Sequence, residues 1–145
     1  MKILILGAGR VGSSLASTLS KQEYEVSIVD LNKDKLLSLQ EDFDLATEIG
    51  HASHPNTLER AGADQETIVL AVTNSDECNI TSCQIAKSKF NVKKTICRLS
   101  DSSYLNSLEA FGEKNIDIAI GPENEVTEHL VDLIKHPGAE QIESF

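Results

Sequence analysis

A glycine-rich segment near the start of the chain has the residue spacing of a dinucleotide-binding turn. Gly7-Ala8-Gly9-Arg10-Val11-Gly12 follows a short apolar run and precedes a segment in which apolar residues recur every four positions. In such a turn the first glycine permits a tight bend, the second lets the backbone approach a pyrophosphate, and the third lets helix and strand pack closely. The free N–H groups of the following helix attract the anion. The pattern predicts pyrophosphate binding, and the alternative is a tight turn without a ligand.

Asp30 is the second residue of this pattern, because it ends the next apolar segment 23 positions after Gly7. A carboxylate there accepts hydrogen bonds from ribose hydroxyls, and its charge disfavours a 2′-phosphate. Lys33 and Lys35 lie nearby but are not placed to neutralise Asp30, so the sequence favours NAD over NADP. The alternative is that Asp30 caps a surface loop. Arg10, inside the turn, either reaches phosphate oxygens or is a solvated side chain.

Polar residues also follow three later apolar segments. Thr73-Asn74-Ser75-Asp76 either contacts the ligand or caps the next helix, and both readings stay open. Arg98 either approaches a phosphate or pairs with a carboxylate. His51-Ala52-Ser53-His54 is expected beside the adenine. Two histidines three positions apart suggest a metal, but no acidic or thiol partner of suitable spacing follows, so we predict adenine packing or loop structure and no metal site.

The elements that must position these residues alternate between strand and helix. The predicted strands are Lys2–Leu6, Glu25–Asp30, Leu45–Ile49, Thr67–Val72, Lys94–Leu99 and Ile116–Ile120. The predicted helices are Arg10–Lys21, a helix capped by Asn32, Pro55 to a stop at Gly62, Asp76–Phe90, Ser102–Phe111 and Pro122 to about Lys135. Six such units predict an α/β fold: a six-stranded, doubly wound parallel sheet of the Rossmann type in three α/β/α layers. Its ligand crevice lies at the carboxyl ends of the strands.

Composition limits the classes of partner and chemistry. A net charge of −10 over 145 residues repels nucleic acid and anionic lipid headgroups, although plain solubility also explains it. No signal peptide or membrane span is expected.

Cys78, Cys83 and Cys97 lack a CxxC spacing and are expected to be reduced thiols in a cytosolic protein. No G-K-[ST] motif completes a P-loop, and neither Tyr24 nor Tyr104 has a lysine four residues later. The sequence supports binding and sensing, and it does not support catalysis.

Several segments together resemble a known family. They are the glycine turn, Gly50-His51-Ala52-Ser53-His54-Pro55, Ala61-Gly62-Ala63-Asp64, Ala71 to Glu77 and Pro137-Gly138-Ala139. In these segments the chain is similar to the TrkA family, regulatory subunits of bacterial Trk potassium-uptake systems within the wider class of RCK (or KTN) domains. The resemblance implies a cytoplasmic subunit, peripherally associated with the membrane, that binds NAD(H) or the adenine nucleotides ATP and ADP. It would gate a potassium-translocating membrane subunit of the TrkH or TrkG type.

The resemblance also implies site residues and an architecture. Family nucleotide contacts map onto Gly7 to Val11, Asp30, Thr73, Asn74 and Arg98. Residues 1–136 would form the RCK N-terminal domain, and residues 137–145 would begin a linker toward an RCK C-terminal domain. The family forms homodimers through the last helix, here 123–135, and higher oligomers in full-length proteins.

One position departs from the family pattern. The family often has a second arginine two positions beyond the first on the fifth strand, where this chain has Ser100. The loss of that cation favours NAD(H) over ATP. Two other classes stay open: an excised NAD-binding domain of a dehydrogenase and a dimerisation module that binds no nucleotide.

Overall fold

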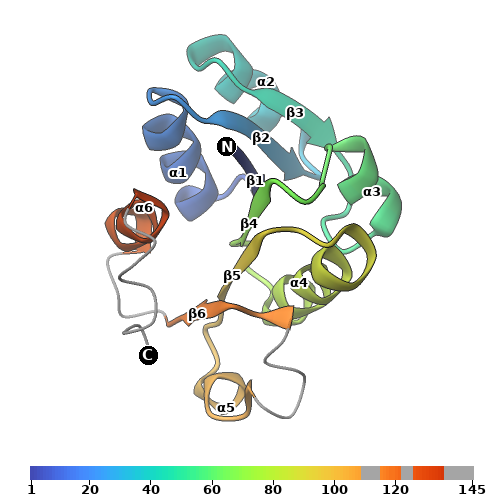
Figure 1. The fold of residues 1–145 in the computed structure, drawn as a ribbon. Helices are drawn as coiled ribbons and strands as arrows, with labels where there is room; N and C mark the ends of the chain where they lie inside the picture. Colours follow the sequence, from blue (N-terminus) through green and yellow to red (C-terminus); the bar gives the residue numbers. More distant parts are fainter. Residues whose placement is uncertain (109–114, 122–125, 136–145) are drawn as a thin grey trace.

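A single parallel sheet with the strand order β3-β2-β1-β4-β5-β6 organises the chain (Figure 1). The computed structural model describes residues 1–108, 115–121 and 126–135. The strands are β1 (Lys2–Leu6), β2 (Glu25–Asp30), β3 (Ala46–Ile49), β4 (Thr67–Ala71), β5 (Lys94–Arg98) and β6 (Ile118–Ile120). The chain order reverses between β1 and β4, the point where doubly wound sheets bind their ligands.

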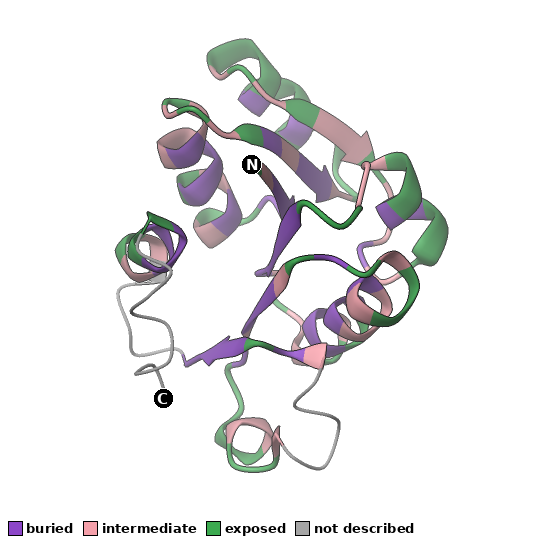
Figure 2. Cartoon of the chain, viewed as in Figure 1, coloured by how far each residue is buried: buried purple, intermediate pink, exposed green. Residues whose placement is uncertain are grey.

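Helices cover both faces of the sheet, which confirms the predicted three-layer α/β/α arrangement. The helices are α1 (Arg10–Ser20), α2 (Lys33–Asp42), α3 (Pro55–Arg60), α4 (Asp76–Phe90), α5 (Ser102–Leu105) and α6 (Val126–Lys135). Helices α1, α2 and α6 pack on one face and α3 and α4 on the other, where residues of α5 also join the apolar cluster (Figures 1 and 2). No helix in the described ranges is long and apolar enough to cross a membrane.

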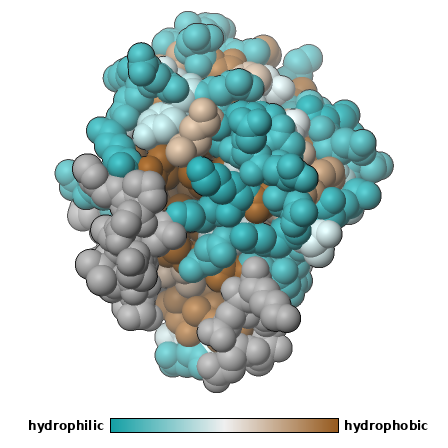
Figure 3. All heavy atoms as spheres, in the orientation of Figure 1, coloured by the Kyte–Doolittle hydropathy of each residue, from teal (hydrophilic) through white to brown (hydrophobic). Residues whose placement is uncertain are grey.

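The central strands are apolar on both faces because both faces are covered. In β1, Ile3 and Ile5 pack toward α1, while Leu4 and Leu6 pack toward α4. All four side chains are at most 2% exposed. Continuous aliphatic runs of this kind are typical of parallel strands buried between two helical layers. On the face seen in Figure 3, hydrophilic side chains cover most of the described surface, in keeping with the net charge of −10.

Three predicted boundaries near the end of the chain differ from the structure. The helix predicted to reach Phe111 ends at Leu105 and continues into turns, and residues 109–114 lie outside the described ranges. The last strand begins at Ile118 and not at Ile116. Ile116 is buried, which explains the apolar pattern, but just before it the Thr95 hydroxyl donates to the Asn115 carbonyl at 2.7 Å. The predicted start of the last helix at Pro122 also lies outside the described ranges, as do residues 136–145.

Smaller differences affect the other strands. Strand β3 begins at Ala46, one residue later than predicted, while β4 and β5 each end one residue earlier. The Val72 N–H still donates to the Leu6 carbonyl at 3.0 Å, and the Leu99 N–H donates to the Ile120 carbonyl at 3.0 Å. The backbone therefore keeps the strand direction for one residue beyond the assigned end of β4 and of β5. Polar residues that follow these strands therefore lie at the carboxyl edge of the sheet.

Candidate nucleotide-binding site

Two glycines of the glycine turn, Gly7 after β1 and Gly12 in the first turn of α1, are required by the packing of the protein itself. Gly7 has a φ of +109°, and a Cβ atom there would lie 3.0 Å from the Cα atom of Thr73. A Cβ atom on Gly12 would lie 1.7 Å from the Gly7 carbonyl oxygen. The turn can pack against β4 and α1 only if both positions lack a side chain.

Gly9 is different, because neither its conformation nor its packing requires glycine. Its φ of −77° and ψ of −159° are extended values that any residue adopts. Apart from its two chain neighbours, no described residue has an atom within 4 Å of a Cβ atom built at this position. Gly9 is also the N-cap of α1, which has no side-chain cap and no acidic residue in its first turn, whereas Asn32 and Ser75 cap α2 and α4. The first N–H groups of α1 are thus open to an anion.

Two adjoining cavities lie at this edge of the sheet. The glycine-turn cavity, of about 360 Å³, is lined by Gly7, Gly9, Arg10, Val11, Asp30, Lys35, Val72, Thr73, Asn74 and Arg98. The His51 cavity, of about 450 Å³, is lined by Gly7, Val29, Asp30, Leu31, Gly50, His51, Ala52, Ser53, Thr73, Asn74, Ser75, Glu77, Cys78 and Thr81. The two share Gly7, Asp30, Thr73 and Asn74. Of the predicted site residues, only Ala8 and Gly12 line neither cavity; the structure brings the other ten together.

Asp30 holds the glycine turn in place. Its Oδ1 accepts a hydrogen bond from the Ala8 N–H and its Oδ2 accepts one from the Asn32 N–H, each at 2.8 Å. Each carboxylate oxygen has a second lone pair available for a ribose hydroxyl. The sequence offered loop capping and ribose binding as alternatives for Asp30; the carboxylate makes the loop contacts and also faces both cavities.

Asn79 is a site residue that the sequence analysis missed. It is fully buried on α4, and its Oδ1 accepts from the Thr73 N–H at 3.0 Å and lies 2.7 Å from the Thr73 Oγ1. Its Nδ2 donates to the carbonyls of Thr73 and Arg98 at 3.1 and 2.8 Å. Asn79 therefore joins the ends of β4 and β5. The available signal was its position four residues before the inward-facing Cys83, where a polar residue needs buried partners.

The loop after β4 both caps α4 and lines the two cavities. The Ser75 hydroxyl caps α4 by accepting from the Cys78 N–H at 3.1 Å, and Asn79 holds Thr73. Asn74 is exposed and lines both cavities. Ser75 also lines the His51 cavity, so the segment both caps α4 and faces the cavities, and its contact with a ligand stays a prediction.

The cations of the glycine-turn cavity have no carboxylate partner in the described parts of the chain. Neither Arg10 nor Arg98 forms an ion pair there, so the predicted pairing of Arg98 with a carboxylate is not seen in these ranges. The buried Nε of Arg98 has no hydrogen-bond partner among the described residues, and its Nη1 lies 3.5 Å from the Thr73 carbonyl oxygen. Lys35 lines the same cavity and forms no ion pair with Asp30 in the described ranges, in keeping with the prediction that it lies near Asp30 without neutralising it.

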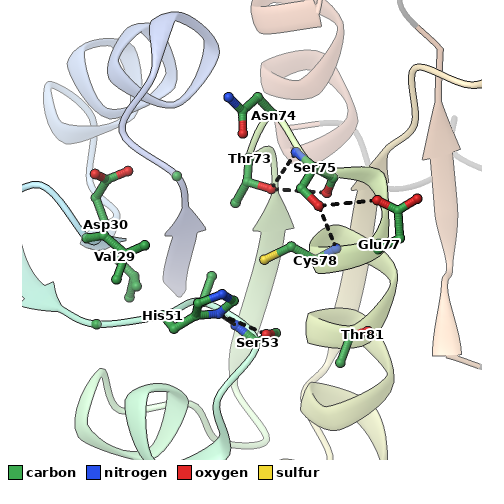
Figure 4. Close-up of a pocket in the computed structure, with 14 residues that line it drawn as sticks. Val29, Asp30, His51, Ser53, Thr73, Asn74, Ser75, Glu77, Cys78 and Thr81 are labelled. Carbon is green, nitrogen blue, oxygen red and sulfur yellow. Dashed lines mark hydrogen bonds between the residues drawn. The ribbon is translucent and has the colours of Figure 1, made fainter.

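The histidine segment forms one wall of the His51 cavity (Figure 4). The rings of His51 and His54 stack with centroids 4.5 Å apart and planes 14° apart, and the His51 Nδ1 lies 2.9 Å from the Ser53 Oγ. Figure 4 shows Asp30 on β2 and Cys78 on α4 at two sides of this space, with the Cys78 sulfur directed into it. Within the described residues, no group of three or more His, Cys, Asp or Glu could hold a metal ion.

Two titratable groups near the cavities have perturbed pKa values. The Tyr104 hydroxyl donates to the Glu77 Oε2 at 2.7 Å, which lowers the pKa of Glu77 and raises that of Tyr104.

Cys78, Cys83 and Cys97 are free thiols. A contact with the Cys97 thiol, together with complete burial, raises the pKa of Cys83 well above its usual value, which keeps it protonated and unreactive.

A doubly wound sheet with a glycine turn at its switch point defines a Rossmann domain of the dinucleotide-binding class. Within that class, the chain belongs to the TrkA-N domain family, whose model matches residues 3–122.

Similar proteins agree with the family assignment, and similar solved structures agree with the fold. The Trk system potassium uptake protein TrkA of Vibrio alginolyticus is 44% identical over the whole chain, which spans 32% of that relative. The NAD(P)-binding domain of an exopolyphosphatase-related protein from Archaeoglobus fulgidus has a TM-score of 0.71 at 22% identity, covering 92% of this chain and 96% of that one. The GsuK channel bound to NAD has a TM-score of 0.65 at 19% identity, covering 82% of this chain and 21% of that one. GsuK bound to ADP has a TM-score of 0.63 at 20% identity, covering 83% of this chain and 31% of that one.

Proposed function

We propose that this chain is a nucleotide-sensing regulatory domain that binds NAD(H) or an adenine nucleotide and controls a potassium-translocating membrane protein. The observation that carries the proposal is Gly9. Neither a left-handed φ nor a steric contact within the described protein requires a glycine there, while a phosphate approaching the open end of α1 does. Arg10 and Arg98, without carboxylate partners in the described ranges, supply charge for a phosphate.

The two cavities fit the parts of such a nucleotide. In this proposal the phosphates lie in the glycine-turn cavity against the N–H groups that begin α1, and the ribose hydroxyls donate to Asp30. The adenine lies in the His51 cavity, which offers the apolar side chains of Val29 and Ala52 and the ring of His51. Asn74 lines both cavities and contacts the ligand where the two meet.

The potassium-uptake role rests on the relatives. The curated relatives in Vibrio alginolyticus and Halomonas elongata, 44% and 40% identical, are named Trk system potassium uptake protein TrkA. We infer a cytoplasmic, peripherally membrane-associated regulator with a membrane partner of the TrkH or TrkG type and no catalytic activity of its own. We also propose that residues 1–136 form the RCK N-terminal domain, that 137–145 begin a linker, and that homodimers form through the helix at 123–135. Nucleotide would act by binding one arrangement of paired domains more tightly, since a tenfold bias needs only about 1.4 kcal/mol.

Calorimetric titration with NAD, NADH, ADP and ATP tests nucleotide binding. We expect at least one of the four to bind the natural chain, and Gly9→Ala to weaken that binding by about tenfold or more because its methyl group occupies the approach to the phosphates. Ser14→Ala, an exposed change on α1, is the matched control. Absence of binding by all four nucleotides would remove the basis of the proposal.

Co-purification in detergent tests the partner. A TrkH- or TrkG-type subunit should be retained by the immobilised chain. Adding the nucleotide that binds in the titrations should change the amount of subunit retained. Gly9→Ala should retain the subunit but lose the response to nucleotide. If the natural chain retains no such subunit with or without nucleotide, the potassium-uptake role is contradicted while nucleotide binding stands.

A further inference from the structure

Helix α4 carries a second buried polar residue besides Asn79. Ser82 is 0% exposed, like Asn79, and its hydroxyl donates to the Ala52 carbonyl at 3.0 Å. A serine inside a helix often bonds instead to the carbonyl four residues earlier on its own helix. Here the partner lies 30 residues earlier in the chain, in the segment that follows β3. The hydrogen bond of Ser82 therefore joins two separate elements of the fold.

Ser82 holds the histidine segment, which forms one wall of the His51 cavity. Within the segment the contacts are local: the His54 N–H donates to the His51 carbonyl at 3.1 Å, and the His51 Nδ1 lies 2.9 Å from the Ser53 Oγ. These bonds determine the shape of the turn and not its distance from α4. The Ala52 side chain packs in the apolar cluster of this face, and the bond from Ser82 orients the Ala52 peptide against the helix.

The same helix also lines the His51 cavity. Cys78 and Thr81 of α4 face the cavity, and Figure 4 shows them beside the histidine segment, in which His51 is labelled. Ser82 follows Thr81 directly but lines neither of the two cavities, so its hydroxyl is placed to act on the histidine segment and not on a ligand. Because Ser82 fixes the Ala52 peptide against α4, it also fixes the space between the His51 ring and the helix.

Asn79 has the corresponding position on the phosphate side. Its Nδ2 donates to the carbonyls of Thr73 and Arg98, whose guanidinium lines the glycine-turn cavity. The Ser82 and Asn79 side chains both belong to α4 and are both fully buried. One helix thus supports the two halves of the site through two different side chains, Ser82 for the histidine segment and Asn79 for the ends of β4 and β5.

We propose that Ser82 is a positioning residue for the adenine of the bound nucleotide, acting through the Ala52 peptide and the His51 ring. This inference rests on the proposed nucleotide site and deepens it, because it assigns the base and the phosphates to separate supports on α4. Without the Ser82 hydroxyl the buried Ala52 carbonyl loses its partner, and the histidine segment is free to move away from the helix. The phosphates, held by the glycine turn and Arg98, keep their contacts.

Ser82→Ala and Ser88→Ala form a matched pair of variants. Both remove one hydroxyl from α4, but Ser88 is exposed and donates to the Gln84 carbonyl of its own helix. The affinities for adenosine and for pyrophosphate are measured by competition calorimetry, against whichever of NAD, NADH, ADP and ATP binds the natural chain most tightly. The NMR chemical shifts of the His51 ring, recorded without nucleotide, report the position of the histidine segment independently of binding. Ser82→Cys, whose thiol is a weaker donor, is the second variant and should show the same pattern to a smaller extent.

The expected result is a loss confined to the base. In Ser82→Ala the affinity for adenosine should fall about fivefold, the affinity for pyrophosphate should stay within about twofold, and the His51 ring shifts should move. Ser88→Ala should change none of the three. Equal losses for the two ligands would mean that Ser82 only stabilises the fold, and this outcome overturns the inference, as does an unchanged adenosine affinity or an unchanged His51 shift. Nucleotide binding by the natural chain stands in each of these cases. If none of the four nucleotides binds the natural chain, the proposed function fails and the inference fails with it.

Discussion

The Ala8 backbone N–H donates a hydrogen bond to the Asp30 Oδ1 at 2.8 Å, linking the glycine turn after β1 to the end of β2. The same carboxylate accepts from the Asn32 N–H through its other oxygen, also at 2.8 Å. One side chain therefore orients the turn and also the entry to α2, from which Lys35 reaches the cavity. Asp30 acts on the ligand directly through its free lone pairs and indirectly through the position of the turn.

Replacing this carboxylate by an amide should affect both stability and binding. In Asp30→Asn one oxygen becomes an NH₂ group, which cannot accept from a backbone N–H, so one of the two hydrogen bonds is lost. We expect a loss of about 1 kcal/mol in the free energy of unfolding, measured in urea, and weaker NAD binding. Asp44→Asn, an exposed carboxylate away from both cavities, should change neither. Unchanged stability in Asp30→Asn would mean that its contacts to the turn contribute nothing.

The first and last turn positions should separate folding from binding. Gly12→Ala places a methyl carbon 1.7 Å from the Gly7 carbonyl oxygen and should destabilise the fold by about 3 kcal/mol. Gly9→Ala adds a methyl group that meets no described atom within 4 Å beyond its chain neighbours, and it should cost about 1 kcal/mol or less, since an N-cap tolerates glycine better than alanine. Thermal and urea unfolding of the two variants measure the contrast. Equal losses would contradict the distinct roles assigned to the two glycines.

Asn79 should be necessary for the shape of the site. Asn79→Leu keeps the branched shape but leaves the Thr73 N–H and the carbonyls of Thr73 and Arg98 without their buried partner. We expect a loss of about 2–4 kcal/mol in the free energy of unfolding, since buried polar groups lose their hydrogen bonds. Ser88→Ala, an exposed change on the same helix, should cost less than about 0.5 kcal/mol. A stable Asn79→Leu variant with unchanged nucleotide binding would show that the network is dispensable.

Arg98 should contribute to binding through phosphate alone. Its guanidinium lines the glycine-turn cavity but not the His51 cavity. We expect Arg98→Gln to weaken ADP binding by about tenfold and to leave adenosine, which has no phosphate, within about twofold. Parallel titrations with the two ligands measure this difference. A similar loss for both would indicate that Arg98 shapes the whole site and does not pair with a phosphate.

Acid sensitivity should depend in part on Asp64. A hydrogen bond from Lys2 at 2.8 Å, with others from the Glu66 N–H and the Thr67 hydroxyl, lowers the pKa of Asp64 below its usual value of 3.8. A carboxylate whose pKa is lower in the folded state contributes stability that is present above pH 3.8 and is lost as the pH falls through the folded value. Urea unfolding at pH 7 and pH 3 should therefore show a smaller difference for Asp64→Asn than for the natural chain. Because Asp64 is half exposed the effect will be modest, and Asp44→Asn should not reproduce it.

The layers of the fold could be predicted from local patterns. Ile3 to Leu6 is aliphatic at every position because a central parallel strand is covered on both faces, and this is visible in the sequence. The glycine spacing could be predicted for a similar reason, since Gly7 and Gly12 lie within one turn and their contact depends on few residues. At the ends, where Thr95 bonds to Asn115 before β6 begins, the local pattern was misleading because a distant side chain determines the boundary.

The sequence by itself determined the elements, the turn and the residue types able to bind a phosphate. Only the tertiary structure decided how they combine: that Asp30 holds Ala8, that Asn79 joins Thr73 to Arg98, and that Lys35 enters the cavity. The hydrogen-bonded partners in these contacts are up to 22 residues apart, and their meeting depends on the order β2-β1-β4-β5. Periodicity and spacing report which face a residue occupies within its own element. Which elements become neighbours is decided by the packing of the whole sheet.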